Sequence, residues 1–181
     1  MSIEVNELEE EGQYKFKIIL AGEGAVGKTT LINRFVHGQF KSDYKATIGV
    51  EITSKRLVQD QQDISLQIWD IAGQTLFRSI RNKFFSNARG ALLVYDITIQ
   101  ETLESLHVWI RDIEAVTGRI PFVLIGNKSD LFELRTVSLE HVDAFRELET
   151  IPHHYDTSAL TGENVEAAFS DLARLMVNTE R

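Results

Sequence analysis

The chain has 181 residues, of which 43% are apolar and 25% charged, and these values fit one folded domain rather than a disordered or collagen-like chain. It contains no cysteine, which excludes disulfide bridges, thiol nucleophiles and cysteine-ligated metal sites, and no lipid anchor is expected. The net charge of −8 argues against general binding to nucleic acid or anionic lipid, and no apolar run approaches the ~18 residues of a membrane span.

Much of the acidic charge lies at the N-terminus. Residues 1–13 contain five glutamates and no lysine or arginine, so they carry −5 of the net −8. We expect this segment to form an acidic flexible arm, because it has little apolar surface to bury. The predicted folded domain is residues 14–178, and residues 179–181 form a short C-terminal tail.

Apolar runs of strand length alternate along the chain with longer segments of helical periodicity. This alternation predicts an α/β domain in which helices pack on a parallel sheet. The first strand is expected at residues 15–21. It is followed by a glycine-rich turn and by a helix from about Thr29 to Gly38, because glycine is a natural C-cap.

A hairpin interrupts this pattern, because residues 51–58 and 64–69 alternate with period two around the polar turn 59–63. Three further strands are expected at residues 91–96, 121–126 and 154–157. The apolar faces of the later helices are Leu103, Leu106, Trp109, Ile110, Ile113 and Val116; Val142, Phe145 and Leu148; and Val165, Ala168, Leu172, Leu175 and Met176. The predicted fold is a doubly wound, six-stranded, mostly parallel sheet with one antiparallel strand and helices on both faces.

The glycine-rich turn has the sequence GEGAVGKT at residues 22–29, which matches the phosphate-binding pattern GxxxxGK[ST]. Glycines let the backbone approach a phosphate with its amide groups pointing inward, and the following helix adds its positive N-terminus. Lys28 would bridge the β- and γ-phosphates, and the Thr29 hydroxyl would ligate Mg²⁺. The predicted phosphate-binding residues are Gly24, Ala25, Val26, Gly27, Lys28, Thr29 and Thr30.

Asp70 ends the apolar run LQIWD and is a second candidate for Mg²⁺ binding. A carboxylate at the end of a strand beside a phosphate-binding loop holds this ion, usually through water. The position alone is weak evidence, because acidic residues also cap strand ends. Because the chain also contains the phosphate-binding motif, we expect Asp70 to bind Mg²⁺ rather than only to cap its strand.

The sequence Asn127-Lys128-Ser129-Asp130 follows a strand that should end on the same edge of the sheet. The Asp130 carboxylate can accept hydrogen bonds from N1–H and the 2-amino group of guanine, whereas adenine has an acceptor at N1 and no 2-amino group. Asn127 would brace the base-binding loops, and Lys128 would lay its stem over the ring. The motif predicts guanine selectivity; the alternative is an ordinary polar loop.

Together these motifs resemble those of the Ras superfamily of small GTPases, over residues 15–176. The loop GEGAVGKT is most similar to the Rho version. The run TIGVE at residues 47–51, LQIWD followed by Ala72-Gly73-Gln74, and the Trp109 helix look like Rab, and no long insertion follows NKSD. The resemblance is therefore to a Rab-like protein.

The resemblance implies roles for five more residues. Phe40 would pack edge-on against guanine, Tyr44 would cover the phosphates, and Thr47 would ligate Mg²⁺ and contact the γ-phosphate. Gly73 would donate its N–H to that phosphate, and Gln74 would orient the attacking water. The implied catalytic residues are Gln74, Lys28 and Thr47, and the implied metal-binding residues are Thr29, Thr47 and Asp70.

The run DTSAL at residues 156–160 resembles the last guanine-binding loop of the family. Ser158, Ala159 and Leu160 would contact the base, with the Ala159 N–H bonding its O6 atom. The chain departs from the family here, because Leu160 replaces the usual lysine. Ile71 and Thr75 also replace the common threonine and glutamate beside the catalytic glutamine.

Hydrolysis of GTP requires a positioned water and stabilised charge on the phosphate and leaving oxygens. Residues 36–46 contain two lysines but no arginine, so intrinsic hydrolysis should be slow. The resemblance implies an exchange factor, an activating protein that supplies an arginine, and effectors, in membrane trafficking or signalling. We expect a cytoplasmic monomer, recruited to membranes by a partner, that binds GTP or GDP with Mg²⁺ and acts as a switch.

Two other functions stay open. A guanine-nucleotide-binding interaction module with negligible hydrolysis would result if Ile71 or Thr75 displaced Gln74. A P-loop enzyme with another phosphoryl acceptor would need an arginine-rich lid, and the sequence shows no such segment. The candidate effector-facing residues are Trp69, Phe77, Phe84 and Phe85, with core packing as the alternative for the last two.

Overall fold

The structure is a computed structural model that describes residues 14–40, 47–73, 80 and 82–180. Six strands in this part of the chain form one sheet: β1 Tyr14–Ala21, β2 Val50–Gln59, β3 Gln62–Ile71, β4 Gly90–Asp96, β5 Phe122–Asn127 and β6 His153–Thr157. The α-helices are α1 Lys28–His37, α3 Gln100–Glu104, α4 Leu106–Thr117, α5 Leu139–Glu149 and α6 Val165–Glu180, and the 3₁₀ helices are η2 Asn82–Phe84 and η3 Ser129–Leu134.

The strand order β2-β3-β1-β4-β5-β6 places β1 inside the sheet. Neighbouring strands run parallel except β2 and β3, which form an antiparallel hairpin. This order confirms the predicted doubly wound, six-stranded fold. Because β3 and β4 flank β1, the loops that follow these three strands leave the carboxyl edge of the sheet side by side, where folds of this class bind ligands.

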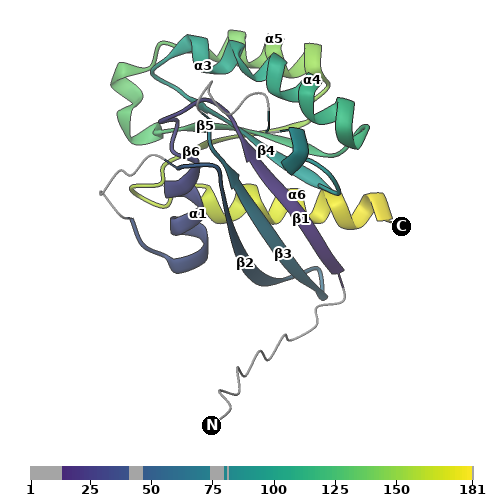
Figure 1. The fold of residues 1–181 in the computed structure, drawn as a ribbon. Helices are drawn as coiled ribbons and strands as arrows, with labels where there is room; N and C mark the ends of the chain where they lie inside the picture. Colours follow the sequence, from purple (N-terminus) through teal and green to yellow (C-terminus); the bar gives the residue numbers. More distant parts are fainter. Residues whose placement is uncertain (1–13, 41–46, 74–79, 81, 181) are drawn as a thin grey trace.

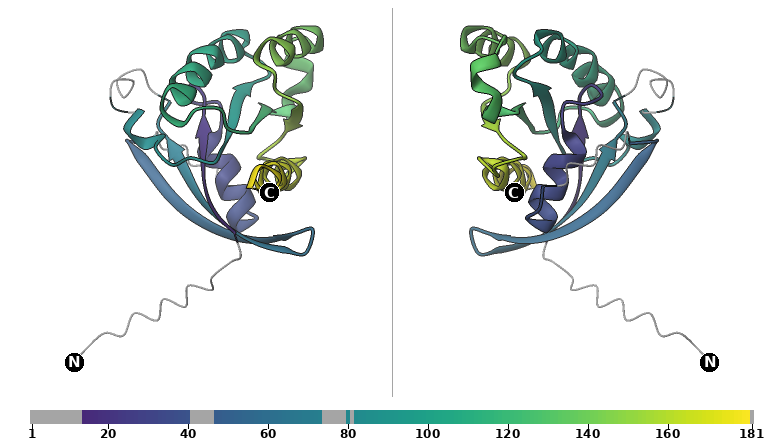
Figure 2. Two further views of the ribbon diagram at one scale, coloured as in Figure 1. Left: turned by 90° about the vertical axis from the view of Figure 1, so that its right-hand side faces the viewer. Right: turned by 90° about the vertical axis from the view of Figure 1, so that its left-hand side faces the viewer.

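Helices cover both faces of the sheet: α3, α4 and α5 lie on one side, and α1 and α6 on the other (Figures 1 and 2). Successive residues of β1 point to opposite faces. Ile18 and Leu20 pack toward α1 and α6, where the rings of Phe35 and Phe169 stack at 4.0 Å between centroids. Ile19 packs toward α4 and α5. Burial on both faces is why this strand reads as a continuous apolar run.

Two residues of the predicted apolar faces are exposed instead. Val116, in the last turn of α4, is 40% exposed, and Leu148, near the end of α5, is 73% exposed. The helical period of 3.6 residues places Glu149, not Leu148, on the same face as the buried Val142. Glu149 uses that face to pair with His107 of α4.

Within the described part of the chain, no helix has the length and hydrophobicity needed to span a bilayer.

The hairpin turn is shorter than the predicted 59–63. Strand pairing continues to Gln59 opposite Gln62, so the loop consists of Asp60 and Gln61. Both loop residues have left-handed φ values, +49° and +63°. Two positive φ angles in a two-residue loop define a type I′ turn, whose twist matches that of the strands.

We expect Gln61→Gly to raise the free energy of unfolding by about 1 kcal/mol, because glycine adopts positive φ without the steric cost of a Cβ. Urea denaturation would measure the change. The matched control is Gln59→Gly at the end of β2, where residue 59 still pairs with Gln62, and it should lower stability, since glycine weakens a paired strand. A loss of stability in Gln61→Gly would contradict the assignment of the turn.

Candidate functional site

The glycine-rich loop connects β1 to α1 as predicted. Ala25 and Gly27 have φ values of +64° and +100°. Gly27 is the N-cap of α1, and no described side chain caps this end of the helix, so the first turn presents its N–H groups and the positive end of the dipole. A Cβ at Gly27 would lie 2.2 Å from Nδ2 of Asn127, so a side chain is excluded here. The loop has the backbone geometry of an anion site.

Lys28 extends back across this loop and is 7% exposed. Its Nζ donates to the carbonyl oxygens of Gly22 at 2.7 Å and Glu23 at 2.8 Å. Burial lowers the pKa of Lys28 to about 8, against the opposing effect of the Asp70 and Glu23 carboxylates. The group therefore remains largely cationic at neutral pH, as a phosphate-binding lysine requires.

The three predicted metal-binding residues come together from three elements. The Oγ1 atoms of Thr29 in α1 and Thr47 before β2 lie 2.8 Å apart. Both hydroxyls donate to Oδ2 of Asp70 in β3, Thr47 at 3.3 Å. Asp70 is 2% exposed, and its Oδ1 is buried with no hydrogen-bond partner among the described residues.

This oxygen set fits Mg²⁺. The ion binds hard oxygen ligands and is usually held by one or two carboxylates together with substrate phosphates and water. A buried carboxylate oxygen without a partner costs free energy unless a cation or water satisfies it. Among the described residues, no group of three or more histidines or carboxylates could hold a metal ion.

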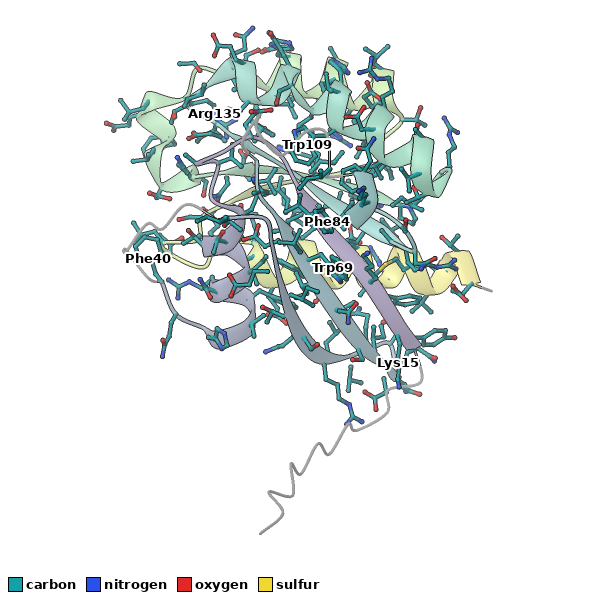
Figure 3. All side chains as sticks on the ribbon, viewed as in Figure 1. Lys15, Phe40, Trp69, Phe84, Trp109 and Arg135 are labelled. Atoms are coloured by element: carbon teal, nitrogen blue, oxygen red, sulfur yellow. The ribbon has the colours of Figure 1, made fainter. Side chains whose placement is uncertain are left out.

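Gly73 follows β3 and packs directly against the phosphate-binding loop. A Cβ on Gly73 would lie 2.4 Å from the carbonyl carbon of Glu23 and 2.5 Å from the backbone nitrogen of Gly24. Only glycine therefore allows this approach. The predicted water-orienting Gln74 and phosphate-covering Tyr44 lie outside the described residues. Phe40 follows α1 with 41% of its surface exposed (Figure 3).

Asn127 at the end of β5 links the base-binding side of the site to the phosphate-binding loop. Its Nδ2 donates to the carbonyl oxygen of Val26 at 2.9 Å, and its Oδ1 accepts from Oγ1 of Thr157 at 3.1 Å. Asn127 is 2% exposed and Thr157 fully buried. This contact with both loops is the geometry expected of a bracing residue.

The neighbouring Lys128 has a left-handed φ of +69° and pairs with Oδ2 of Asp96 at 2.5 Å. Asp96 accepts from the backbone N–H of Thr98 at 2.9 Å and from its Oγ1 at 2.7 Å. Hydrogen bonds from Lys128 and Thr98 hold the pKa of Asp96 below its usual value although burial opposes them. Asp96 was not predicted from the sequence. The available signal was that Asp96 is an acidic residue at the end of a buried apolar strand, β4, as Asp70 is at the end of the apolar run LQIWD.

Asp130 contacts the run at residues 156–160, the other segment expected to bind the base. Oγ of Ser158 donates to Oδ1 of Asp130 at 2.5 Å and accepts from the backbone N–H of Thr161 at 3.1 Å. Ala159 is 5% exposed, whereas the Leu160 side chain is 49% exposed. The carboxylate is thereby joined to the loop whose Ala159 N–H was expected to bond O6 of the same base.

A polar cluster anchors the start of that loop. The Asp156 carboxylate pairs with Arg135 (labelled in Figure 3), and Nδ2 of Asn164 donates to the Asp156 carbonyl at 2.8 Å. Beneath them, Oη of Tyr95 lies 3.1 Å from Nε2 of His154. Burial raises the pKa of Tyr95 and lowers that of His154, so both are neutral near pH 7.

Two other contacts were not predicted, because they join residues far apart in the sequence. Nε1 of Trp109 in α4 donates to the carboxylate of Glu23, a residue of the phosphate-binding loop, at 3.4 Å. Arg34 in α1 hydrogen-bonds the carbonyl oxygens of Ala159 and Leu160. In a sequence, a basic residue near the end of a helix is interpreted as a surface charge. The sequence therefore contains no signal that Arg34 contacts the loop at residues 159–160.

The candidate effector-facing residues divide between surface and core. Phe85 is fully buried, while Trp69 and Phe84 are half-buried and lie together on one face, with ring centroids 6.4 Å apart (Figure 3). Nζ of Lys17 stands 3.5 Å above the Trp69 ring. Phe77 lies outside the described residues. Core packing, the alternative considered for Phe85, is therefore confirmed.

A sequence model of the Ras family matches residues 17–178. The Ras-related protein RABA4b of Arabidopsis thaliana is 42% identical over 167 residues, covering 92% of this chain and 74% of that protein. Rab11E of Lotus japonicus is 44% identical over 165 residues, covering 91% and 75% respectively. Rab-30 of Homo sapiens is 40% identical over 173 residues, covering 95% and 85%.

The chain therefore belongs to the Ras family and is a Rab-like small GTPase. This confirms the resemblance drawn from its motifs. Members of the Ras and Rab families are GTPases that bind GTP or GDP, generally with Mg²⁺.

Proposed function

We propose that this chain is a GTP-hydrolysing switch in membrane trafficking. The observation that carries the proposal is the convergence of Thr29, Thr47 and Asp70 beside the Lys28 loop. These residues come from separate elements, and a shared ligand explains why three oxygen-bearing side chains and an unpartnered carboxylate oxygen meet there.

In this proposal the phosphates lie on the loop of residues 24–30 and the base lies between the two guanine loops. Asp130 accepts from N1–H and the 2-amino group, and the Ala159 N–H donates to O6. Phe40, Lys128 and Leu160 contact the ring and its edge. Ser158 supports this arrangement, because its hydroxyl orients the Asp130 carboxylate through Oδ1 and leaves a lone pair on each carboxylate oxygen for the two guanine donors.

Thr29 and Thr47 would bind Mg²⁺ through their hydroxyls, and Asp70 through water. When bound, the ion neutralises charge on the β- and γ-phosphate oxygens. Lys28 adds a fixed positive charge at the bridge between these phosphates. Tyr44 covers them, and Gly73, whose backbone packs on the loop, donates its N–H to the γ-phosphate.

Hydrolysis transfers the γ-phosphoryl group to water. The water oxygen bonds to the γ-phosphorus while the bond to the β-phosphate oxygen breaks, and the products are GDP and inorganic phosphate. Gln74 orients this water. With no arginine in residues 36–46, the intrinsic rate is slow, and an activating protein supplies the missing positive charge.

Loss of the γ-phosphate removes a contact from both Thr47 and Gly73, so the loops that carry them change conformation. Effectors would read this change beside the half-buried pair Trp69 and Phe84. An exchange factor would replace GDP by GTP. The chain acts as a monomer in the cytoplasm, and a partner recruits it to membranes.

The test of this function is single-turnover GTP hydrolysis. We expect Gln74→Leu to slow the reaction at least about tenfold, because leucine cannot orient the water, while GTP affinity is retained. The control Gln100→Leu changes an exposed residue of α3 and should hydrolyse at the wild-type rate. Equal rates in Gln74→Leu and wild type would contradict the role of Gln74. Tight GTP binding without turnover would instead favour a guanine-nucleotide-binding interaction module.

A further inference from the structure

Arg34, on the last turn of α1, contacts two segments that are distant in the sequence. Its Nε donates to the carbonyl oxygen of Ala159 at 2.8 Å, and its Nη2 donates to that of Leu160. Its Nη1 donates to the carbonyl oxygen of Gly38 at 3.0 Å. The guanidinium is planar with fixed N–H directions, so the three carbonyl groups are held in one arrangement relative to each other.

The first segment contains the N–H group that is proposed to bond O6 of guanine. Arg34 holds the peptide groups that follow this N–H, through the carbonyls of Ala159 and Leu160. On the preceding side, the Ser158 carbonyl accepts from the Gly162 N–H at 2.8 Å. Because each peptide group is planar, constraints on both sides leave the Ala159 N–H little freedom to turn.

The second segment leads to the other side of the base. Gly38 ends α1 with a left-handed φ of +67°, and its N–H donates to the Arg34 carbonyl at 2.9 Å. Phe40 follows two residues later. One side chain thus fixes both the loop that reads O6 and the start of the segment that carries the ring-packing Phe40.

We propose that Arg34 is a positioning residue for guanine recognition, which holds the Ala159 N–H toward the O6 atom. The proposal rests on the assignment of these loops to guanine under the proposed function. Arg34 does not itself contact the base. Its loss frees the last guanine loop, so the weakened interaction is the hydrogen bond to O6 rather than the pair of bonds at Asp130.

The probe for this bond is 6-thio-GDP. It keeps the N1–H and 2-amino groups but replaces the O6 acceptor by sulfur, a weaker acceptor. We expect wild type to prefer GDP over 6-thio-GDP by about tenfold, the value of one good hydrogen bond. In Arg34→Gln this preference should fall close to one, with GDP affinity about tenfold lower. Arg34→Lys, which cannot span three carbonyls, should give an intermediate ratio.

The control is Arg111→Gln on the exposed face of α4, which should keep the wild-type ratio. A purely structural role would weaken both nucleotides equally and leave the ratio unchanged, which would overturn the proposal. If Arg34→Gln does not fold, the ratio in Arg34→Lys decides in the same way. A wild-type chain that binds neither nucleotide would contradict the proposed function instead.

Discussion

Asp130→Asn is expected to turn the preference of the site from guanine to xanthine nucleotides by a factor of about 100 or more. In the proposed complex guanine would present two donors to this residue, and an amide could accept from only one of them. Xanthine has a carbonyl at C2, which the amide N–H can reach. For guanine, the substitution replaces two hydrogen bonds to a charged carboxylate by one bond and one unmatched donor. A loss of this kind accounts for a change in preference of this size.

The structure gives a reason why the asparagine amide would face the base correctly. The Ser158 hydroxyl donates to Oδ1 of Asp130 at 2.5 Å. In the variant it would hold the amide oxygen in that position, so the NH₂ group is the one turned toward the ligand. Adding Ser158→Ala should therefore reduce the gain for xanthosine diphosphate.

Titration calorimetry with GDP and xanthosine diphosphate measures the preference. The matched control is Asp143→Asn, an exposed carboxylate of α5 paired with Arg146, which should leave the preference unchanged. Unaltered selectivity in Asp130→Asn would show that another residue reads the N1–H edge.

The second large effect is expected at the proposed metal site, where Asp70→Asn should weaken the dependence of GDP binding on Mg²⁺. Asp70 is the carboxylate that receives the Thr29 and Thr47 hydroxyls, and it is 2% exposed. Removal of a charged partner that acts on a metal through water costs about 10- to 100-fold in metal affinity. The amide keeps the shape of the side chain, so the fold is retained.

The rate of GDP release, with Mg²⁺ and after its removal by EDTA, gives the readout. Wild type should release GDP faster once the metal is removed, while Asp70→Asn should release it fast in both conditions. Asp63→Asn, at the exposed hairpin ion pair with Arg56, serves as the control and should behave as wild type. A variant with the wild-type response to EDTA would rule out Asp70 as a metal-binding residue.

Much of the fold followed from local sequence patterns. A strand buried on both faces must be apolar throughout, which is why residues 15–21 and 91–96 were recognisable, and Gly38 ended α1 because it tolerates left-handed φ. The misplaced positions were Leu148, Val116 and the hairpin turn. Leu148 lies off the buried face because of the helical period itself, whereas the exposure of Val116 and the length of the hairpin turn depend on a neighbouring element, which periodicity within one segment does not report.

The sequence by itself predicted which residues would bind phosphate, magnesium and guanine, because their motifs are contiguous and each sets local backbone geometry. Only the tertiary structure decided which of them touch. Three side-chain contacts join segments that are distant in the sequence: Asn127 with the phosphate-binding loop, Lys128 with Asp96, and Arg34 with Ala159. The physical reason is that side-chain hydrogen bonds reach about 3 Å, so they depend on how the sheet order and helix packing place segments far apart in the chain.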